Sequence, residues 1–279
     1  MLIYWFIGLS VTVLAMLGYV FYKKIRLNKT NILSDASQFV AKPTNGRRLV
    51  VPDIHGCCKT LQELLKQKVK LQANDQLFLL GDYIGRGPDS RGVIEYILDL
   101  QAQGYEVYPL RGNHEQALLD KANKYSASGK RFMSYIAREK IFDLLDEQQR
   151  LDKRYWRFFD ELSHFYELDK YLLVHAGFNF DQFNPFLDKQ AMLWTRHYEP
   201  NEKFLRGKQI VQGHMPTSMK KIMRSIKDKA PRLILDNGCV FLSKLNNREQ
   251  GKLGHLLCMD LDTQKVFIQR NIDKLVQND

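Results

Sequence analysis

Metal-binding side chains recur directly after short apolar segments of this sequence. Seven residues stand at such positions: Asp53, His55, Asp82, Asn113, His114, His175 and His214. All except His114 form a mixed set of carboxylate, imidazole and amide ligands without a thiolate, which suits Mn²⁺, Fe or Zn²⁺ better than an oxygen-only Mg²⁺ or Ca²⁺ site. A carboxylate shared by two such ions can hold them about 3.5 to 4 Å apart, where they activate water and bind a phosphoryl group.

The segments that carry these residues alternate with helical patterns, which predicts an α/β domain. The apolar runs LVVPD, QLFLLGD and EVYPLRGN are separated by helices expected near residues 59–68 and 90–103. A mostly helical stretch is expected from Glu115 to about Leu162, and it is followed by the expected strands YLLVHAG, QIVQGH, RLILDNG, LLCMDL and KVFIQRN. Loops at the carboxyl ends of strands in open α/β sheets converge on one crevice, so the polar residues are expected to meet there.

The composition excludes several classes of protein. With 279 residues, 44% of them hydrophobic, the chain can bury a core, so it is neither a disulfide-stapled miniature nor a disordered or collagen-like chain. A net charge of +11 suits an anionic partner such as a phosphorylated substrate, a nucleic acid or an acidic membrane surface. The cysteines lack zinc or disulfide spacing, and free thiols are expected at Cys57, Cys58, Cys239 and Cys258.

Residues 1–22 carry no charged side chain, which predicts a single-pass membrane anchor. At about 1.5 Å per residue a helix of this length spans about 33 Å, enough to cross a hydrocarbon layer of about 30 Å. Four basic residues follow at once, namely Lys23, Lys24, Arg26 and Lys29. This excess of positive charge places the remainder in the cytoplasm, with residues 23–46 as a basic juxtamembrane segment and linker and residues 47–275 as the folded domain. The alternative is a translation start nearer to the folded domain.

Five fragments in order resemble the calcineurin-like metallophosphoesterases, in the phosphoprotein phosphatase branch that includes bacterial protein phosphatases and diadenosine tetraphosphatases. They are PDIHG, GDYIGRGPDS, LRGNHE, VHAG and QGHMP, and the resemblance covers roughly Arg47 to Asn271. It implies an α/β fold, a calcineurin-like four-layer αββα sandwich of two mixed sheets, with two divalent metal ions between the sheets. The ligands it implies are Asp53, His55 and Asp82 for the first ion, and Asp82, Asn113, His175 and His214 for the second. Asp82 is then the bridge, and Mn²⁺ is the expected metal, with Fe or Zn²⁺ as alternatives.

The resemblance also implies roles in catalysis for three further residues. Arg86, and Arg196 in LWTR, match the phosphate-binding arginines of the family, and a guanidinium can bind phosphate oxygens in pairs. His114 matches the general acid, which protonates the leaving oxygen while a metal-bridging hydroxide attacks the phosphorus in line. No covalent phosphoenzyme is expected.

Gly85 departs from the family pattern. Protein phosphatases carry an aspartate at this place in GDxxDRG, and its carboxylate orients the general-acid histidine. His114 is therefore expected to lack an orienting carboxylate, and Gly85→Asp is expected to accelerate the cleavage of poor leaving groups. Diadenosine tetraphosphatases carry a small residue at this place, whereas LWTR, QGHMPT and DNGCV resemble the bacterial protein phosphatases.

These observations leave three functions open. The first expectation is a dinuclear-metal-dependent phosphoesterase that acts as a serine/threonine protein phosphatase. The alternatives are a bis(5'-nucleosyl)-tetraphosphate hydrolase and, in another class, a membrane-tethered pseudophosphatase that binds phospholigands; the intact ligand set argues against the latter. The expected partners are a phosphorylated protein or nucleotide substrate and a membrane, with no nucleic acid.

The anchor can be tested by cell fractionation. The full-length protein is expected to sediment with membranes and to need detergent for its release, whereas a variant that lacks residues 1–22 should stay in the supernatant. Protease added outside intact cells should leave the folded domain uncut, because the domain is expected in the cytoplasm. Digestion from outside, or a mature protein without these residues, would contradict the prediction.

Overall fold

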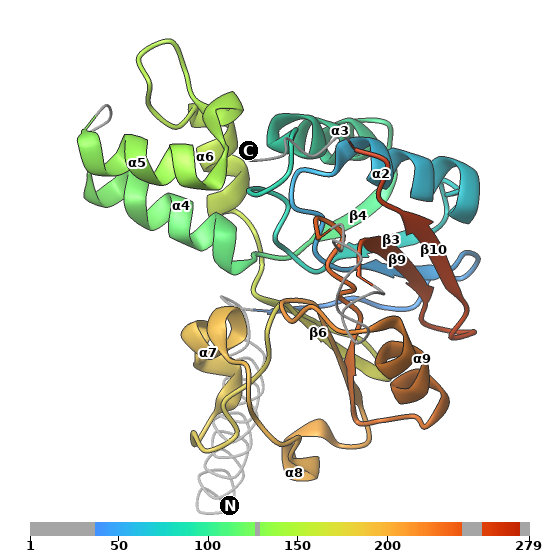
Figure 1. Cartoon of the computed structure of the whole chain (residues 1–279). Helices are drawn as coiled ribbons and strands as arrows, with labels where there is room; N and C mark the ends of the chain where they lie inside the picture. Colours follow the sequence, from blue (N-terminus) through green and yellow to red (C-terminus); the bar gives the residue numbers. More distant parts are fainter. Residues whose placement is uncertain (1–36, 126–128, 242–252, 274–279) are drawn as a thin grey trace, which may run out of the picture.

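The computed structural model, which describes residues 37–125, 129–241 and 253–273, contains two five-stranded sheets (Figure 1). The first has the order β10-β9-β2-β3-β4, formed by β2 (Arg48–Val51), β3 (Gln76–Leu79), β4 (Glu106–Pro109), β9 (His255–Asp260) and β10 (Val266–Arg270). The second has the order β1-β5-β6-β7-β8, formed by β1 (Ser37–Phe39), β5 (Phe165–Glu167), β6 (Tyr171–Val174), β7 (Gln209–Gln212) and β8 (Arg232–Ile234). Both sheets are mixed, because β2, β3 and β4 run parallel, as do β6, β7 and β8, beside antiparallel neighbours.

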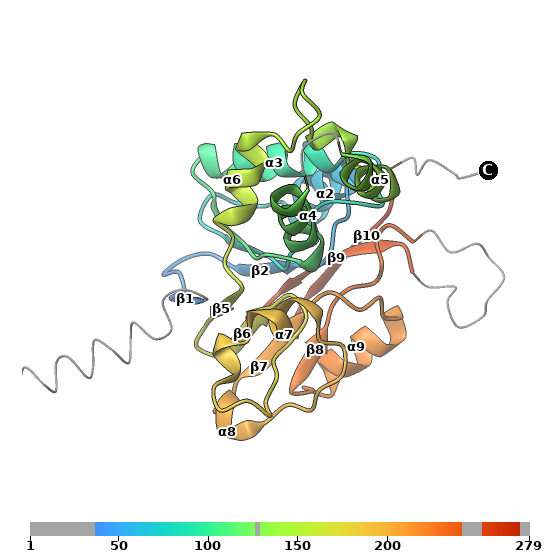
Figure 2. The same ribbon diagram turned by 90° about the vertical axis from the view of Figure 1, so that its left-hand side faces the viewer.

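Helices cover the outer faces of the two sheets (Figure 2). The layer over the first sheet consists of α2 (Cys58–Glu63), the π-helical η1 (Leu64–Val69), α3 (Ser90–Ala102), α4 (Asn113–Lys124), α5 (Lys130–Glu139), η2 (Phe142–Leu144) and α6 (Lys153–Asp160). The thinner layer beside the second sheet consists of η3 (Pro185–Leu187), α7 (Lys189–Trp194), α8 (Glu202–Leu205) and α9 (Met219–Lys227).

Successive side chains on the strands point to opposite faces of each sheet, which gives three apolar layers: one between the sheets and one on the outer face of each sheet. On β2, Leu49 and Val51 pack toward the helices, while Val50 packs into the core between the sheets. On β6, Leu173 joins the core between the sheets, whereas Leu172 packs on the outer side with the aromatic side chains near α7. Strands buried on both faces in this way explain the nearly continuous apolar runs of the sequence.

The strands expected from the sequence are present, and the prediction of two mixed sheets is confirmed. Within residues 23–46, which were expected to form a juxtamembrane segment and linker, Ser37–Phe39 form the short strand β1. This strand pairs in parallel with β5, whose Phe165 lies opposite Ser37. Such a three-residue edge strand is held by backbone bonds to a distant segment and leaves no periodic pattern in the sequence.

The expected anchor, residues 1–22, lies outside the described residues. Over residues 37–125, 129–241 and 253–273, no helix is both long enough and apolar enough to span a bilayer. The anchor therefore stays a prediction from the sequence.

A buried arginine forms ion pairs with turns that belong to both sheets. Arg48 on β2 is 1% exposed, and its guanidinium donates to Asp262 in the β9–β10 turn at 2.6 and 3.2 Å. The same guanidinium also donates to Asp169 in the turn before β6 of the other sheet. Burial disfavours the charge of Asp262, but the hydrogen bonds and positive charges of Arg48 and Lys42 together outweigh burial and lower the pKa of this carboxyl. The arginine thus bridges turns of both sheets.

Arg48→Met should lower the free energy of unfolding by about 2 to 3 kcal/mol, because it leaves two carboxylates without their buried partner. Urea unfolding measures this effect. Lys42→Met is the matched control, since Lys42 pairs with the same Asp262 but is exposed, and it should cost less than about 1 kcal/mol. The Arg48 effect should shrink as the pH falls below about 4, where the carboxyls become protonated. Equal losses in both variants would contradict the bridging role.

Candidate functional site

The predicted ligands meet where the carboxyl ends of five strands converge. Asp53 and His55 follow β2, and Asp82 follows β3. Asn113 and His114 form the first turn of α4, directly after β4 and its loop. His175 follows β6, and His214 follows β7 of the second sheet. The structure therefore gathers all six proposed metal ligands, and His114, from both sheets.

The backbone is left-handed at three of these positions. His55, Asp82 and His214 have φ values of 49°, 51° and 67°. Non-glycine residues adopt this conformation at a cost of the order of 1 to 3 kcal/mol, and such strain persists only where surrounding contacts hold it. The conformation turns these side chains from the strand ends into the space between the loops.

Glu115 is one of the groups that hold Asp82 in place. Its carboxylate is fully buried and accepts backbone N–H groups of Gly112 at 2.9 Å, Asp82 at 2.9 Å and Tyr83 at 2.8 Å. Burial, and then the charge of Asp82, raises the pKa of Glu115 to about 8. No role was assigned to Glu115 from the sequence, although a glutamate at the third position of a helix is a known capping signal.

In one half of the site, around His175, hydrogen-bond acceptor atoms lie close together. Nδ1 of His175 lies 2.8 Å from the backbone oxygen of Leu80, so Nδ1 carries the hydrogen and Nε2 is left as an acceptor. This Nε2 lies 2.9 Å from Oδ1 of Asn113, 3.1 Å from Nδ1 of His214 and 3.5 Å from Oδ1 of Asp82. Nε2 of His175 and the oxygens of Asn113 and Asp82 are all acceptors, so they repel one another at these distances, and a cation between them would remove the repulsion.

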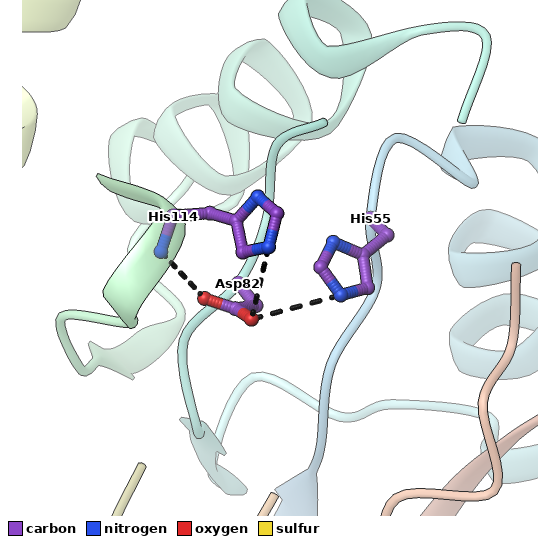
Figure 3. A group of neighbouring side chains, drawn as sticks. All are labelled: His55, Asp82 and His114. Atoms are coloured by element: carbon purple, nitrogen blue, oxygen red, sulfur yellow. Dashed lines mark hydrogen bonds and ion pairs between the residues drawn. The ribbon is translucent and has the colours of Figure 1, made fainter. Parts of the chain in front are cut away.

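The other half of the site has His55 beside the same carboxylate. Nδ1 of His55 donates to the backbone oxygen of Ile84 at 3.0 Å, which leaves Nε2 as the acceptor. That atom lies 3.6 Å from Oδ2 of Asp82 and 4.0 Å from Oδ2 of Asp53. Figure 3 shows the imidazoles of His55 and His114 with one ring nitrogen each directed at the Asp82 carboxylate.

Asp82 is shared by both groups that could hold a metal ion. The ligand atoms of His55, Asp82 and His114 lie within 4.8 Å of one another, as do those of Asp82, His175 and His214. This geometry agrees with the bridging position that the family resemblance implies for Asp82.

The charges of the site also suit two cations. Burial lowers the pKa of His55 and of His214 to about 3, so both imidazoles are neutral at pH 7, as metal binding requires. Burial, then the charges of Asp236 and Asp82, raises the pKa of Asp53 well above its usual value. The residues present therefore fit two divalent ions, whose charge would offset the repulsion between these carboxylates.

Asp236 is a site residue that was not proposed from the sequence. It follows β8, is 2% exposed, and has a pKa raised to about 7, mainly by burial. The sequence could have identified Asp236, since DNGCV places a carboxylate directly after the apolar run RLIL, as at the other strand ends. Its proximity to Asp53 and Asp82 adds negative charge to the site.

The two proposed phosphate-binding arginines differ in their placement. Nη1 of Arg86 lies 3.2 Å from Nε2 of His55, so this guanidinium reaches the ligand cluster. Its carbon Cζ lies 5.4 Å from the centre of the Phe241 ring. Arg196 is exposed after α7, and its positive charge contributes, after burial and His175, to the lowered pKa of His214. Arg86 thus contacts a proposed metal ligand, whereas Arg196 is exposed and acts on His214 through its charge.

The expectation that His114 lacks a carboxylate is wrong. Oε2 of Glu139, at the end of α5, lies 3.5 Å from Nδ1 of His114. A β carbon on Gly85 would lie 3.0 Å from the same Nδ1 and 3.5 Å from the same Oε2, and the φ of +84° at Gly85 disfavours any other residue. The expected gain from Gly85→Asp therefore has no structural support, because the added carboxylate would crowd the imidazole and face the carboxylate of Glu139.

Comparisons with known proteins agree with this geometry. The sequence pattern of the family described as calcineurin-like phosphoesterase matches residues 46–242. A protein named bis(5'-nucleosyl)-tetraphosphatase, symmetrical, from Erwinia tasmaniensis is 33% identical over 128 residues, which are 46% of this chain and 43% of that protein. The chain thus spans less than half the length of the curated relatives that it matches.

Two solved structures share the fold at low identity. One is described as a candidate diadenosine tetraphosphatase; it has a TM-score of 0.56 and 21% identity, over 85% of this chain and 99% of that chain. The other is a serine/threonine protein phosphatase from Saccharomyces cerevisiae, with a TM-score of 0.53 and 17% identity, over 90% of this chain and 87% of that chain.

Metal binding can be measured without an activity assay. Saturating Mn²⁺ should raise the midpoint of thermal unfolding by about 5 to 10 °C, because the ions bind the folded site and relieve its repulsion. Asp82→Asn should abolish most of this rise, whereas Asp53→Asn, which changes a ligand implied by the resemblance for one ion only, should keep part of it. Differential scanning fluorimetry with and without a chelator gives the comparison. A full shift in Asp82→Asn would contradict the shared position of Asp82.

Proposed function

Since this chain belongs to the calcineurin-like phosphoesterase family, we propose that it is a metal-dependent phosphoric ester hydrolase that acts on phosphate monoesters, with phosphoserine and phosphothreonine proteins as its substrates. The observation that carries the proposal is the buried Asp82 carboxylate, with His55 and His175 on its two oxygens and His114 beside it. Divalent ions held there would supply an activated water and neutralise phosphoryl charge.

The chain's own residues perform the remaining tasks. Arg86 can bind two phosphoryl oxygens with its guanidinium, because it reaches the edge of the ligand cluster at His55. His114 can hold a proton on Nε2, which lies 4.0 Å from Oδ2 of Asp82 and faces the cluster. A leaving oxygen bound beside the cluster would therefore receive its proton from this atom.

The position of His114 supports monoesters of alcohols as substrates. The alkoxide of serine or threonine is a poor leaving group, and a positioned acid accelerates its departure by about 10² to 10⁴-fold. The leaving phosphate of a phosphoanhydride needs little protonation. With Glu139 beside Nδ1 of His114, the glycine at residue 85 no longer argues against alcohol leaving groups.

A second candidate is the hydrolysis of bis(5'-nucleosyl) tetraphosphates. It is favoured by the similarity of the chain to proteins named as symmetrical bis(5'-nucleosyl)-tetraphosphatases, at 33% identity in Erwinia tasmaniensis and 32% in Proteus mirabilis. The metal site and Arg86 would serve this reaction equally, because both reactions break a bond from phosphorus to oxygen.

The proposed place of action is the cytoplasmic surface of a membrane. The uncharged segment of residues 1–22 and the basic residues that follow it support this proposal. A tethered phosphatase would act on membrane proteins or on soluble proteins recruited to the same surface.

The proposal is tested with three substrates: a phosphoserine peptide, p-nitrophenyl phosphate and diadenosine tetraphosphate. With Mn²⁺ present, the peptide should be hydrolysed with a higher kcat/KM than the dinucleotide, and a chelator should stop the reaction. His114→Asn should lower kcat on the peptide by about 10²-fold or more, because the leaving oxygen loses its acid.

His197→Asn is the matched control, since His197 is exposed and outside the ligand cluster, and it should leave the rates unchanged. Faster hydrolysis of the dinucleotide would favour the second candidate. Hydrolysis that persists after chelation would contradict both.

A further inference from the structure

The imidazole of His114 lies between two carboxylates from different elements. Its Nε2 lies 4.0 Å from Oδ2 of Asp82, on the side of the metal-binding cluster. Its Nδ1 lies 3.5 Å from Oε2 of Glu139, the last residue of α5. Both side chains are largely buried, with 10% of His114 and 15% of Glu139 exposed. The two ring nitrogens therefore face acceptors on opposite sides.

Glu139 is held by other contacts that aim its carboxylate at His114. Its backbone oxygen accepts the N–H of Arg86 at 2.9 Å, which ties the end of α5 to the loop after Asp82. Its Oε1 accepts Nε of Arg138 at 2.9 Å, so Oε2 is the oxygen that faces the imidazole. The backbone bond thus holds the end of α5 beside the loop, and the ion pair with the exposed Arg138 occupies Oε1.

The space for this carboxylate exists because residue 85 has no side chain. A β carbon at Gly85 would lie within 3.0 Å of Nδ1 and 3.5 Å of the Glu139 oxygen, so it would compete with Glu139 for the same side of the ring. The absence of a side chain at Gly85 therefore leaves space beside Nδ1, and the carboxylate of Glu139 from α5 occupies it.

We propose that Glu139 is the positioning residue for His114, an inference that rests on the function proposed above. The carboxylate accepts a hydrogen bond from Nδ1–H, which stops rotation of the ring and keeps Nε2 directed at the leaving oxygen. In the structure Nδ1 and Oε2 are 3.5 Å apart, which is longer than a normal hydrogen bond, and we expect this distance to shorten when substrate binds, as catalytic hydrogen bonds commonly do. The Glu139–His114 pair would then allow poor leaving groups, such as the serine alkoxide of a phosphoserine protein, to be protonated as they depart.

The first test is Glu139→Gln, which keeps the shape and the backbone bond to Arg86 but replaces the carboxylate by an amide that can itself donate to Nδ1. For a phosphoserine peptide, kcat should fall about tenfold, because leaving-group protonation, which contributes about 10² to 10⁴-fold, is only partly lost. KM should change little. For p-nitrophenyl phosphate, whose leaving group needs little protonation, kcat should fall less than about twofold. Equal losses on both substrates would overturn the proposal.

A double-mutant cycle separates positioning from a general structural effect. In the His114→Asn background, Glu139→Gln should cause no further loss, because the group that it positions is absent. A further loss of similar size would overturn the proposal. Glu161→Gln is the matched control, since Glu161 lies at the end of α6 in the same layer but is exposed, and it should leave kcat unchanged on both substrates.

A spectroscopic measurement decides the question independently of turnover. Nitrogen NMR of histidine side chains, recorded on the protein without added Mn²⁺, should show the Nδ1 resonance of His114, identified by its loss in His114→Asn, at a protonated position. Glu139→Gln should move this resonance, and Glu161→Gln should not. An unmoved resonance would overturn the positioning role even if activity changed. If the wild-type protein hydrolyses none of the substrates, the proposed function fails, while this measurement still tests the Glu139–His114 contact.

Discussion

The site is organised around one carboxylate that serves two groups of imidazoles. Asp82 directs one oxygen to His175 and the other to His55 and His114, from a left-handed backbone conformation that a strand end alone would not adopt. Glu115 offsets that strain, because it accepts the backbone N–H groups of Asp82 and its neighbour. The position of Asp82 therefore depends on a buried acid that binds its backbone.

The sandwich is what allows two half-sites to share that carboxylate. Strands β2, β3 and β4 supply Asp53, His55 and Asp82, and they position α4, whereas His175 and His214 come from the second sheet. The core between the sheets holds the two carboxyl edges side by side, and Arg48 links turns of both sheets. Packing between the sheets is thus a requirement for the chemistry as well as for stability.

The same burial that shapes the site makes it unfavourable without cations. Asp53, Asp82 and Asp236 lie close together with little exposure, and the pKa values of Asp53 and Asp236 are raised, chiefly by burial. The acceptor Nε2 of His175, which faces the oxygens of Asn113 and Asp82, adds to this cost. Such an arrangement is explained by divalent ions, which would turn the mutual repulsion into attraction.

The amino-acid sequence by itself determined the strands and the residues at their ends. Both are local properties: apolar runs such as QLFLL predict a buried strand, and an aspartate or histidine directly after it lies at the carboxyl edge. Only the tertiary structure decided which distant groups support those residues. The pairing of β1 with β5, the bonds of Glu115 and the approach of Glu139 to His114 join segments that carry no shared periodic signal. From the sequence, Gly85 indicated that His114 lacks a carboxylate beside it. In the structure, the packing of α5 against the loop supplies a carboxylate from another element. Such side-chain contacts depend on how helices pack on the core, which local propensity does not determine.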